Sequence, residues 1–69
     1  MERYSRYSDK DGRLHIVLAR WCSAKEVDGA MKITPKTIDL LDVGAEKVNE
    51  VKVEDFDRFV SKGLLMRIQ

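Results

Sequence analysis

The sequence predicts a small α+β domain with an N-terminal β-hairpin, a short central helix and a C-terminal strand–helix–strand unit. Three observations predict it: the hydrophobic period changes twice within residues 48–69, an Asp-Gly turn signal lies at residues 11–12, and Thr34-Pro35 has the form of a helix start. The chain has 69 residues, which is the size of one domain. We therefore expect residues 1–69 to fold as a single unit.

The N-terminal hairpin is predicted from its turn. Asp11-Gly12 lies between two stretches of alternating residues, and this dipeptide is among the strongest short hairpin signals. After the turn, Leu14, Ile16 and Leu18 fall on one face of a strand. Residues 14–22 also match the apolar stripe of a helix, which remains the alternative, but the turn chemistry favours the strand.

The middle of the chain is predicted to be a polar connection over residues 23–30, a short strand at residues 31–33 and then a helix. Thr34 can cap that helix and Pro35 suits its first position, so a helix is predicted over residues 35–43. The alternative is a strand from Thr37 to Val43 that turns at residues 44–47 into the next strand. The chain would then be nearly all β, and in architecture it would resemble a small SH3-like or OB-like β-barrel, an analogy that implies no function.

The C-terminal unit begins with alternation around Val51 and Val53, which is typical of a half-buried strand. A short helix is predicted next, with Asp55 as its cap and Gly63 as the residue that ends it. Alternation resumes at Leu64 and predicts a last strand. The expected core consists of the apolar residues on these predicted faces: Leu14, Ile16, Leu18, Val51, Val53, Phe56, Phe59, Val60, Leu64, Met66 and Ile68.

Composition argues against most kinds of chemical site. The chain has one cysteine, Cys22, and one histidine, His15, so neither an internal disulfide nor the usual Cys/His zinc site can form. Its four glycines are scattered, without a phosphate-binding loop. We therefore expect no catalytic, cofactor-binding or metal-binding residues, no small-molecule substrate and no enzymatic activity. A core this small is marginal, which favours oligomerisation or a protein partner.

The expected location is the cytoplasm. A single thiol is typical of a reducing compartment, and the N-terminal residues contain no apolar run of the kind found in a secretory leader. No stretch reaches the roughly 18 apolar residues of a membrane span, so no membrane contact is expected.

One group of side chains has recognition chemistry, since arginine and aromatic residues are enriched in protein–protein hot spots and also bind phosphates and stack on bases. The predicted partner-binding residues are Tyr4, Arg6, Tyr7, Arg13, Arg20 and Trp21. A competing interpretation places Trp21 in the core and the arginines at solvated strand edges. The predicted function is that of a small non-catalytic intracellular adaptor or regulator that acts by protein docking or self-association. The alternative is a nucleic-acid-binding module that uses Arg3, Arg6, Arg13, Arg20 and the neighbouring aromatic residues.

Overall fold

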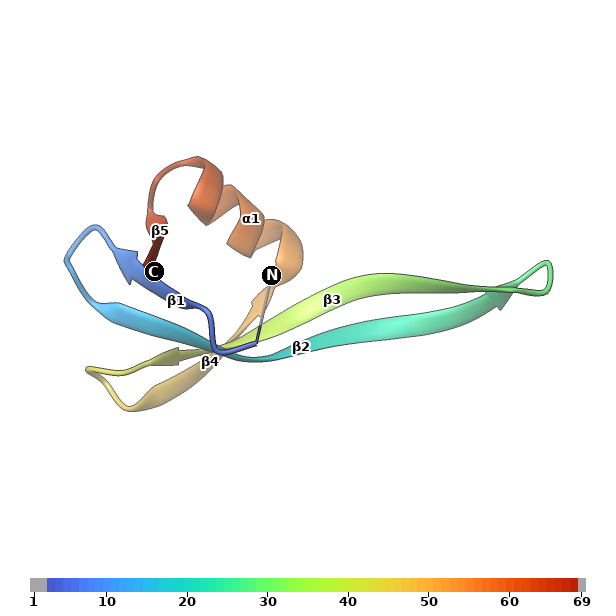
Figure 1. Cartoon of the computed structure of the whole chain (residues 1–69), viewed down its shortest axis with the longest axis horizontal. Coiled ribbons are helices and arrows are strands. Elements are labelled where there is room, and N and C mark those ends of the chain that lie inside the picture. Colours follow the sequence, from blue (N-terminus) through green and yellow to red (C-terminus); the bar gives the residue numbers. More distant parts are fainter. Residues whose placement is uncertain (1–2, 69) are drawn as a thin grey trace.

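The computed structural model describes residues 3–68, which form one five-stranded antiparallel sheet and one helix (Figure 1). In chain order the elements are β1 (Arg6–Asp9), β2 (Leu14–Val27), β3 (Ala30–Asp42), β4 (Lys47–Lys52), α1 (Val53–Ser61) and β5 (Leu65–Ile68). The strand order across the sheet is β4-β3-β2-β1-β5, so β4 and β5 are its edges.

The two longest strands divide the molecule into a body and an arm. The pairing of β1 with β2 reaches Ile16, and the pairing of β4 with β3 begins at Thr37. Farther out, β2 and β3 pair only with each other, as far as Val27 and Ala30. We call residues 21–36 the arm and the remaining described residues the body. The arm extends far beyond the body (Figure 1), and the molecule measures 46 × 24 × 19 Å.

The tip of the arm is a two-residue turn. Asp28 and Gly29 have φ angles of 52° and 78°, and left-handed residues at both positions match the twist of the flanking strands. The prediction of a turn at Asp28-Gly29 is confirmed. The predicted polar connection over residues 23–30 is wrong, because residues 23–27 extend β2 and Ala30 begins β3. A tight turn of this kind lets both strands continue to its edge.

The predicted central helix over residues 35–43 is also wrong, because this segment belongs to β3. Ile38 and Leu40 are buried on one face, so the apolar residues recur with the period of two that is typical of a strand. Pro35 lies next to a register shift between β2 and β3, which is a place where a strand tolerates a residue without an N–H. The alternative strand from Thr37 matches the structure, with β3 ending at Asp42 and β4 starting at Lys47.

The fold class is therefore mostly antiparallel β with one short helix, and the predicted α+β domain with a central helix is wrong. The β-rich alternative describes the strand content, but the sheet is open, with β4 and β5 as free edges.

The N-terminal hairpin is confirmed, since β1 and β2 pair with Tyr7 opposite His15. A helix over residues 14–22 is excluded by this pairing. The Asp9 carboxylate also holds the turn, because Oδ1 accepts the backbone N–H groups of Asp11 and Arg13 at 2.9 and 3.0 Å.

The C-terminal strand–helix–strand unit is confirmed, but its predicted cap is not. Lys52 occupies the N-cap position without a side-chain bond, and Asp55 instead accepts a hydrogen bond from Arg58. At the other end Gly63 has a φ of 73°. Its N–H donates to Val60 O at 3.1 Å and the N–H of Leu64 donates to Phe59 O at 2.8 Å. These two bonds form a Schellman motif, which ends the helix and returns the chain to the sheet.

The core lies between α1 and one face of the sheet. It consists of Tyr7, Val17, Ile38, Leu40, Phe56 and Leu65, with Val51 and Val53 packed against it. The rings of Phe56 and Tyr7 meet edge-on, with 5.1 Å between their centroids. The prediction of Leu14, Ile16, Leu18, Met66 and Ile68 as core is wrong, because none of them is buried. Leu18 lies at a register shift of β2, and the other four lie on the face opposite to α1, which covers Val17 and Leu65. Phe59, Val60 and Leu64 are also more exposed than expected.

Within residues 3–68, no helix is both long enough and apolar enough to cross a membrane.

Candidate functional site

The arm has two different faces, which follow from the register of its strands. One face carries the cross-strand pairs Ser23–Thr34 and Lys25–Lys32. Alternate residues on the other face form the pairs Cys22–Pro35, Ala24–Ile33 and Glu26–Met31. We call Cys22, Ala24, Met31, Ile33 and Pro35 the apolar stripe. One face of the arm is therefore polar and basic between Trp21 at its root and the Val27–Ala30 pair at its tip, and the other is apolar apart from Glu26.

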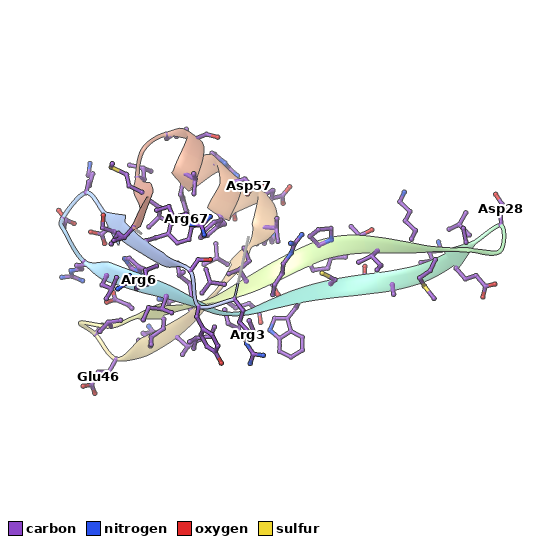
Figure 2. The ribbon with its side chains drawn as sticks, viewed as in Figure 1. Arg3, Arg6, Asp28, Glu46, Asp57 and Arg67 are labelled. Carbon is purple, nitrogen blue, oxygen red and sulfur yellow. The ribbon has the colours of Figure 1, made fainter. Side chains whose placement is uncertain are left out.

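The apolar stripe is open to solvent. Met31 and Ile33 are each 65% exposed, and the Cys22 thiol is exposed and free. Side chains along the arm extend to both sides of the ribbon, and no other element of the described chain lies beside its outer half (Figure 2). A strand pair with free edges and an exposed apolar row is a template for association with another protein.

A second apolar surface lies on the body, on the face of the sheet away from α1. The register aligns Val48, Leu41, Ile16, Arg6 and Ile68 in one row across all five strands. Met66 and Leu14 flank this row, on either side of Ser8. We call these seven residues the bare face, because the only helix of the described chain packs on the opposite face.

The exposed fractions confirm that the bare face is uncovered: Met66 is 63% exposed, Val48 50% and Ile68 37%. Leu14, Ile16 and Leu41, which lie in the middle strands, are half-buried by their neighbours. An antiparallel sheet that faces water on one side normally shows polar residues there. This sheet shows a mostly apolar row on each side.

Aromatic and basic side chains meet at the root of the arm. Trp21 is 57% exposed, and its Nε1–H donates to Oδ2 of Asp39 at 2.9 Å. Together with Arg3, Arg20 and neighbouring residues it lines a surface hollow of about 480 Å³. Arg3, labelled in Figure 2, donates through Nε to Leu18 O at 3.0 Å, and its guanidinium lies 5.1 Å from the centroid of the Tyr4 ring. The interpretation in which Trp21 fills the core is therefore wrong.

The structure divides the residues that the sequence suggested for partner binding. Tyr4, Arg20 and Trp21 lie near the root of the arm, whereas Arg6 lies on the bare face. The remaining two, Tyr7 and Arg13, lie elsewhere. Tyr7 is 6% exposed and packs under Phe56, which removes it from any contact surface. Arg13 lies beside the N-terminal turn, 3.9 Å from the Asp42 carboxylate.

Sequence reasoning missed the apolar stripe and the bare face. A signal for the stripe was present, because polar and apolar residues alternate on both sides of Asp28-Gly29, as in a hairpin. The bare face had no comparable signal. Both faces of the sheet in the body carry apolar residues, and the sequence pattern does not indicate which face the helix covers.

Asp9 and His15 form a hydrogen-bonded pair of titratable groups on the body. Nε2 of His15 lies 2.8 Å from Oδ2 of Asp9. This hydrogen bond, followed by the one from the Arg13 N–H, lowers the pKa of Asp9 below its usual value. Within residues 3–68, no group of three or more His, Cys, Asp or Glu residues is placed to hold a metal ion. We therefore assign the Asp9–His15 pair to the turn that joins β1 and β2.

A second surface hollow, of about 570 Å³, lies between the root of the arm and the start of α1. Its charged lining residues, Lys36, Lys52, Glu54 and Asp57, are all exposed. Each of the two hollows is bordered by solvated side chains.

No protein-family model, no curated protein and no solved structure matches the chain. The function is therefore argued from the surfaces of the molecule.

Proposed function

We propose that this chain is a small non-catalytic protein that works by self-association, and that its arm binds a second copy of the chain. The observation that carries the proposal is the apolar stripe. Met31 and Ile33 lie on a two-stranded ribbon that has no other element of the described chain beside it. Leaving such side chains in water forgoes about 1.5–3 kcal/mol per large apolar residue. Contact with a partner recovers that free energy.

The dimensions of the molecule support a partner of this kind. The chain exposes 5284 Å² of accessible surface, whereas a compact monomer of 8.0 kDa exposes about 4,450 Å². Its radius of gyration is 13.7 Å, against about 11 Å for a compact domain of this length. The excess surface, about 800 Å² per chain, equals the area that each partner buries in a standard protein–protein interface.

A second copy is the partner that the chain itself supplies. A body with six buried apolar residues is a small core, and oligomerisation is a common way to stabilise domains of this size. Homo-oligomers are also the commonest soluble assemblies. The proposal therefore needs no further component.

The test compares two double variants that differ only in the face of the arm they change. Ala24→Lys with Ile33→Lys adds a lysine pair to the apolar stripe, and Ser23→Lys with Thr34→Lys adds the same pair to the polar face. We expect sedimentation equilibrium to show a dimer for the wild type and for the polar-face variant. The stripe variant should dissociate at least about 100-fold more readily, because two charges would be buried without partners.

A wild-type chain that stays monomeric up to millimolar concentration would remove the proposal. Equal dimerisation of the two double variants would show that the apolar stripe of the arm does not bind the second copy.

Nucleic-acid binding is the second candidate, favoured by one observation. Arg3, Arg20 and the exposed Trp21 line the same hollow, and an indole face beside guanidinium groups can stack a base and hold its phosphate. Asp39, which accepts the indole N–H, weakens this electrostatic attraction. Binding of a fluorescent single-stranded oligonucleotide would have to weaken steeply with salt and disappear in Trp21→Ala. No binding at low salt would exclude this candidate.

A further inference from the structure

The chain carries two apolar surfaces that cannot cover each other. The arm continues the direction of β2 and β3 away from the sheet, so its tip at Asp28 lies at the far end of the molecule from Arg6 on the body (Figure 2). The apolar stripe belongs to the arm and the bare face belongs to the body. Contact between the two surfaces therefore requires two molecules.

The two surfaces match in length. Along the bare face, the row from Val48 to Arg6 crosses four neighbouring strands, or three strand spacings. At about 4.8 Å per spacing this distance is about 14 Å. Along the arm, the step from the Cys22–Pro35 pair to the Glu26–Met31 pair is four residues, which at about 3.4 Å each is also about 14 Å. An arm that lies across the strands can therefore place both ends of its stripe on the row.

The charges fix the direction in which the arm lies. Glu26 is the charged member of the apolar face of the arm and lies toward its tip. Arg6 is the charged member of the row on the bare face. With the root of the arm over Val48, Glu26 reaches Arg6 and the two charges pair. In the reverse direction Glu26 would lie over Val48, and two charges would be buried without partners, which is strongly unfavourable.

We infer that the arm of each chain lies across the bare face of a second copy, with Glu26 of the arm against Arg6 of that face. This inference rests on the proposed self-association and names its receiving surface. In a reciprocal exchange, two arms and two bare faces are covered in one closed dimer, and neither apolar surface is left exposed to bind a third chain. Ile33 and Ala24 then pack between Leu41 and Ile16 in the middle of the contact.

The test is a charge exchange between two molecules. Arg6→Glu places Glu against Glu26 at both contacts of the dimer, and Glu26→Arg places Arg against Arg6 at both. We expect each variant alone to dissociate at least about 100-fold more readily than the wild type. An equimolar mixture of the two restores an opposite-charge pair at both contacts. Its dissociation constant should return to within about tenfold of the wild-type value.

Lys25→Glu is the matched control, because Lys25 precedes Glu26 in the sequence and lies on the polar face of the arm. It should leave dimerisation within about threefold of wild type. Circular dichroism checks that Arg6→Glu and Glu26→Arg are folded. If either is not, Arg6→Gln and Glu26→Gln take their place, and each should weaken the dimer by about tenfold.

The outcomes separate this inference from the proposed function. A wild-type monomer would remove the self-association itself. The wild type could dimerise while Arg6→Glu or Glu26→Arg alone dimerises equally well, or while their mixture fails to regain wild-type dimerisation. Either result would leave self-association in place and overturn the contact between Glu26 and Arg6. If mixing restores the dissociation constant and Lys25→Glu leaves it unchanged, the results support binding of the arm to the bare face.

Discussion

The body and the arm are built from the same two strands but are stabilised in different ways. In the body, β2 and β3 are central strands under α1, and Val17 and Ile38 are 1% and 0% exposed. In the arm, the same strands have only each other, and Met31 and Ile33 are 65% exposed. A two-stranded ribbon alone is marginal in water, so the arm depends on its anchorage in the sheet. The comparison shows that register and turn chemistry can extend a hairpin well beyond the core that supports it.

The largest expected effect comes from removing one apolar side chain from each region. Phe56 is 1% exposed, so Phe56→Ala should cost about 3–5 kcal/mol and leave little stability in a domain of this size. Ile33→Ala should change the free energy of unfolding of the monomer by less than about 0.5 kcal/mol, because its side chain is already in water. Urea unfolding measures both changes in the free energy of unfolding, at a protein concentration low enough to keep the chain monomeric.

A comparably large loss from Ile33→Ala in the monomer would show that the arm is buried in the monomer, and would contradict the division into body and arm.

The same substitution at two left-handed glycines gives a smaller test. Gly63 and Gly29 have φ angles of 73° and 78°, and none of the described atoms within 4 Å would meet an added Cβ at either position. The cost is therefore conformational, about 1–2 kcal/mol in each case. Gly63→Ala should lower global stability by that amount, because it disturbs the end of α1. Gly29→Ala should loosen only the tip of the arm.

Hydrogen exchange separates the two glycine variants. Gly29→Ala should speed exchange at arm amides such as those of Val27 and Ala30, with an almost unchanged melting temperature. A large drop in melting temperature would mean that the arm and the body unfold as one cooperative unit.

The smallest effect concerns pH and the turn between β1 and β2. The His15 side chain, then the Arg13 N–H, lower the pKa of Asp9 in the folded chain. The stability from these bonds is therefore complete above the unfolded pKa of about 4, and is lost as the pH falls through the lowered folded value. We expect Asp9→Asn to be less stable than wild type at pH 7, with the difference shrinking below about pH 4.

Urea midpoints across this pH range measure the effect, with Asp28→Asn at the tip of the arm as the control. Asn tolerates the left-handed conformation found at Asp28, so the control should stay close to wild type. A wild-type advantage over Asp9→Asn that does not shrink as the pH falls below about 4 would contradict the assignment.

Part of the candidate site could be predicted from the sequence. The exposed Trp21, Arg20 and Tyr4 were singled out because their residue types are enriched at interfaces, and the structure places them near the root of the arm. Tyr7 was included for the same reason and lies in the core. An amphipathic aromatic ring suits both environments, so residue type alone did not separate them. The apolar stripe was missed because residues 23–30 were predicted to be a polar connection and Thr34-Pro35 a helix start, so no hairpin was expected there.

The sequence by itself determined the local events of this fold. Asp11-Gly12 and Asp28-Gly29 placed two turns, and Gly63 placed the end of α1, because each depends on the conformational preference of neighbouring residues. The tertiary structure decided which face of the sheet is covered. Val17 and Ile16 are both apolar and point to opposite faces, and α1 packs on the side of Val17. Local preferences act over a few residues, whereas the choice of face depends on where a helix more than 30 residues later returns to the sheet.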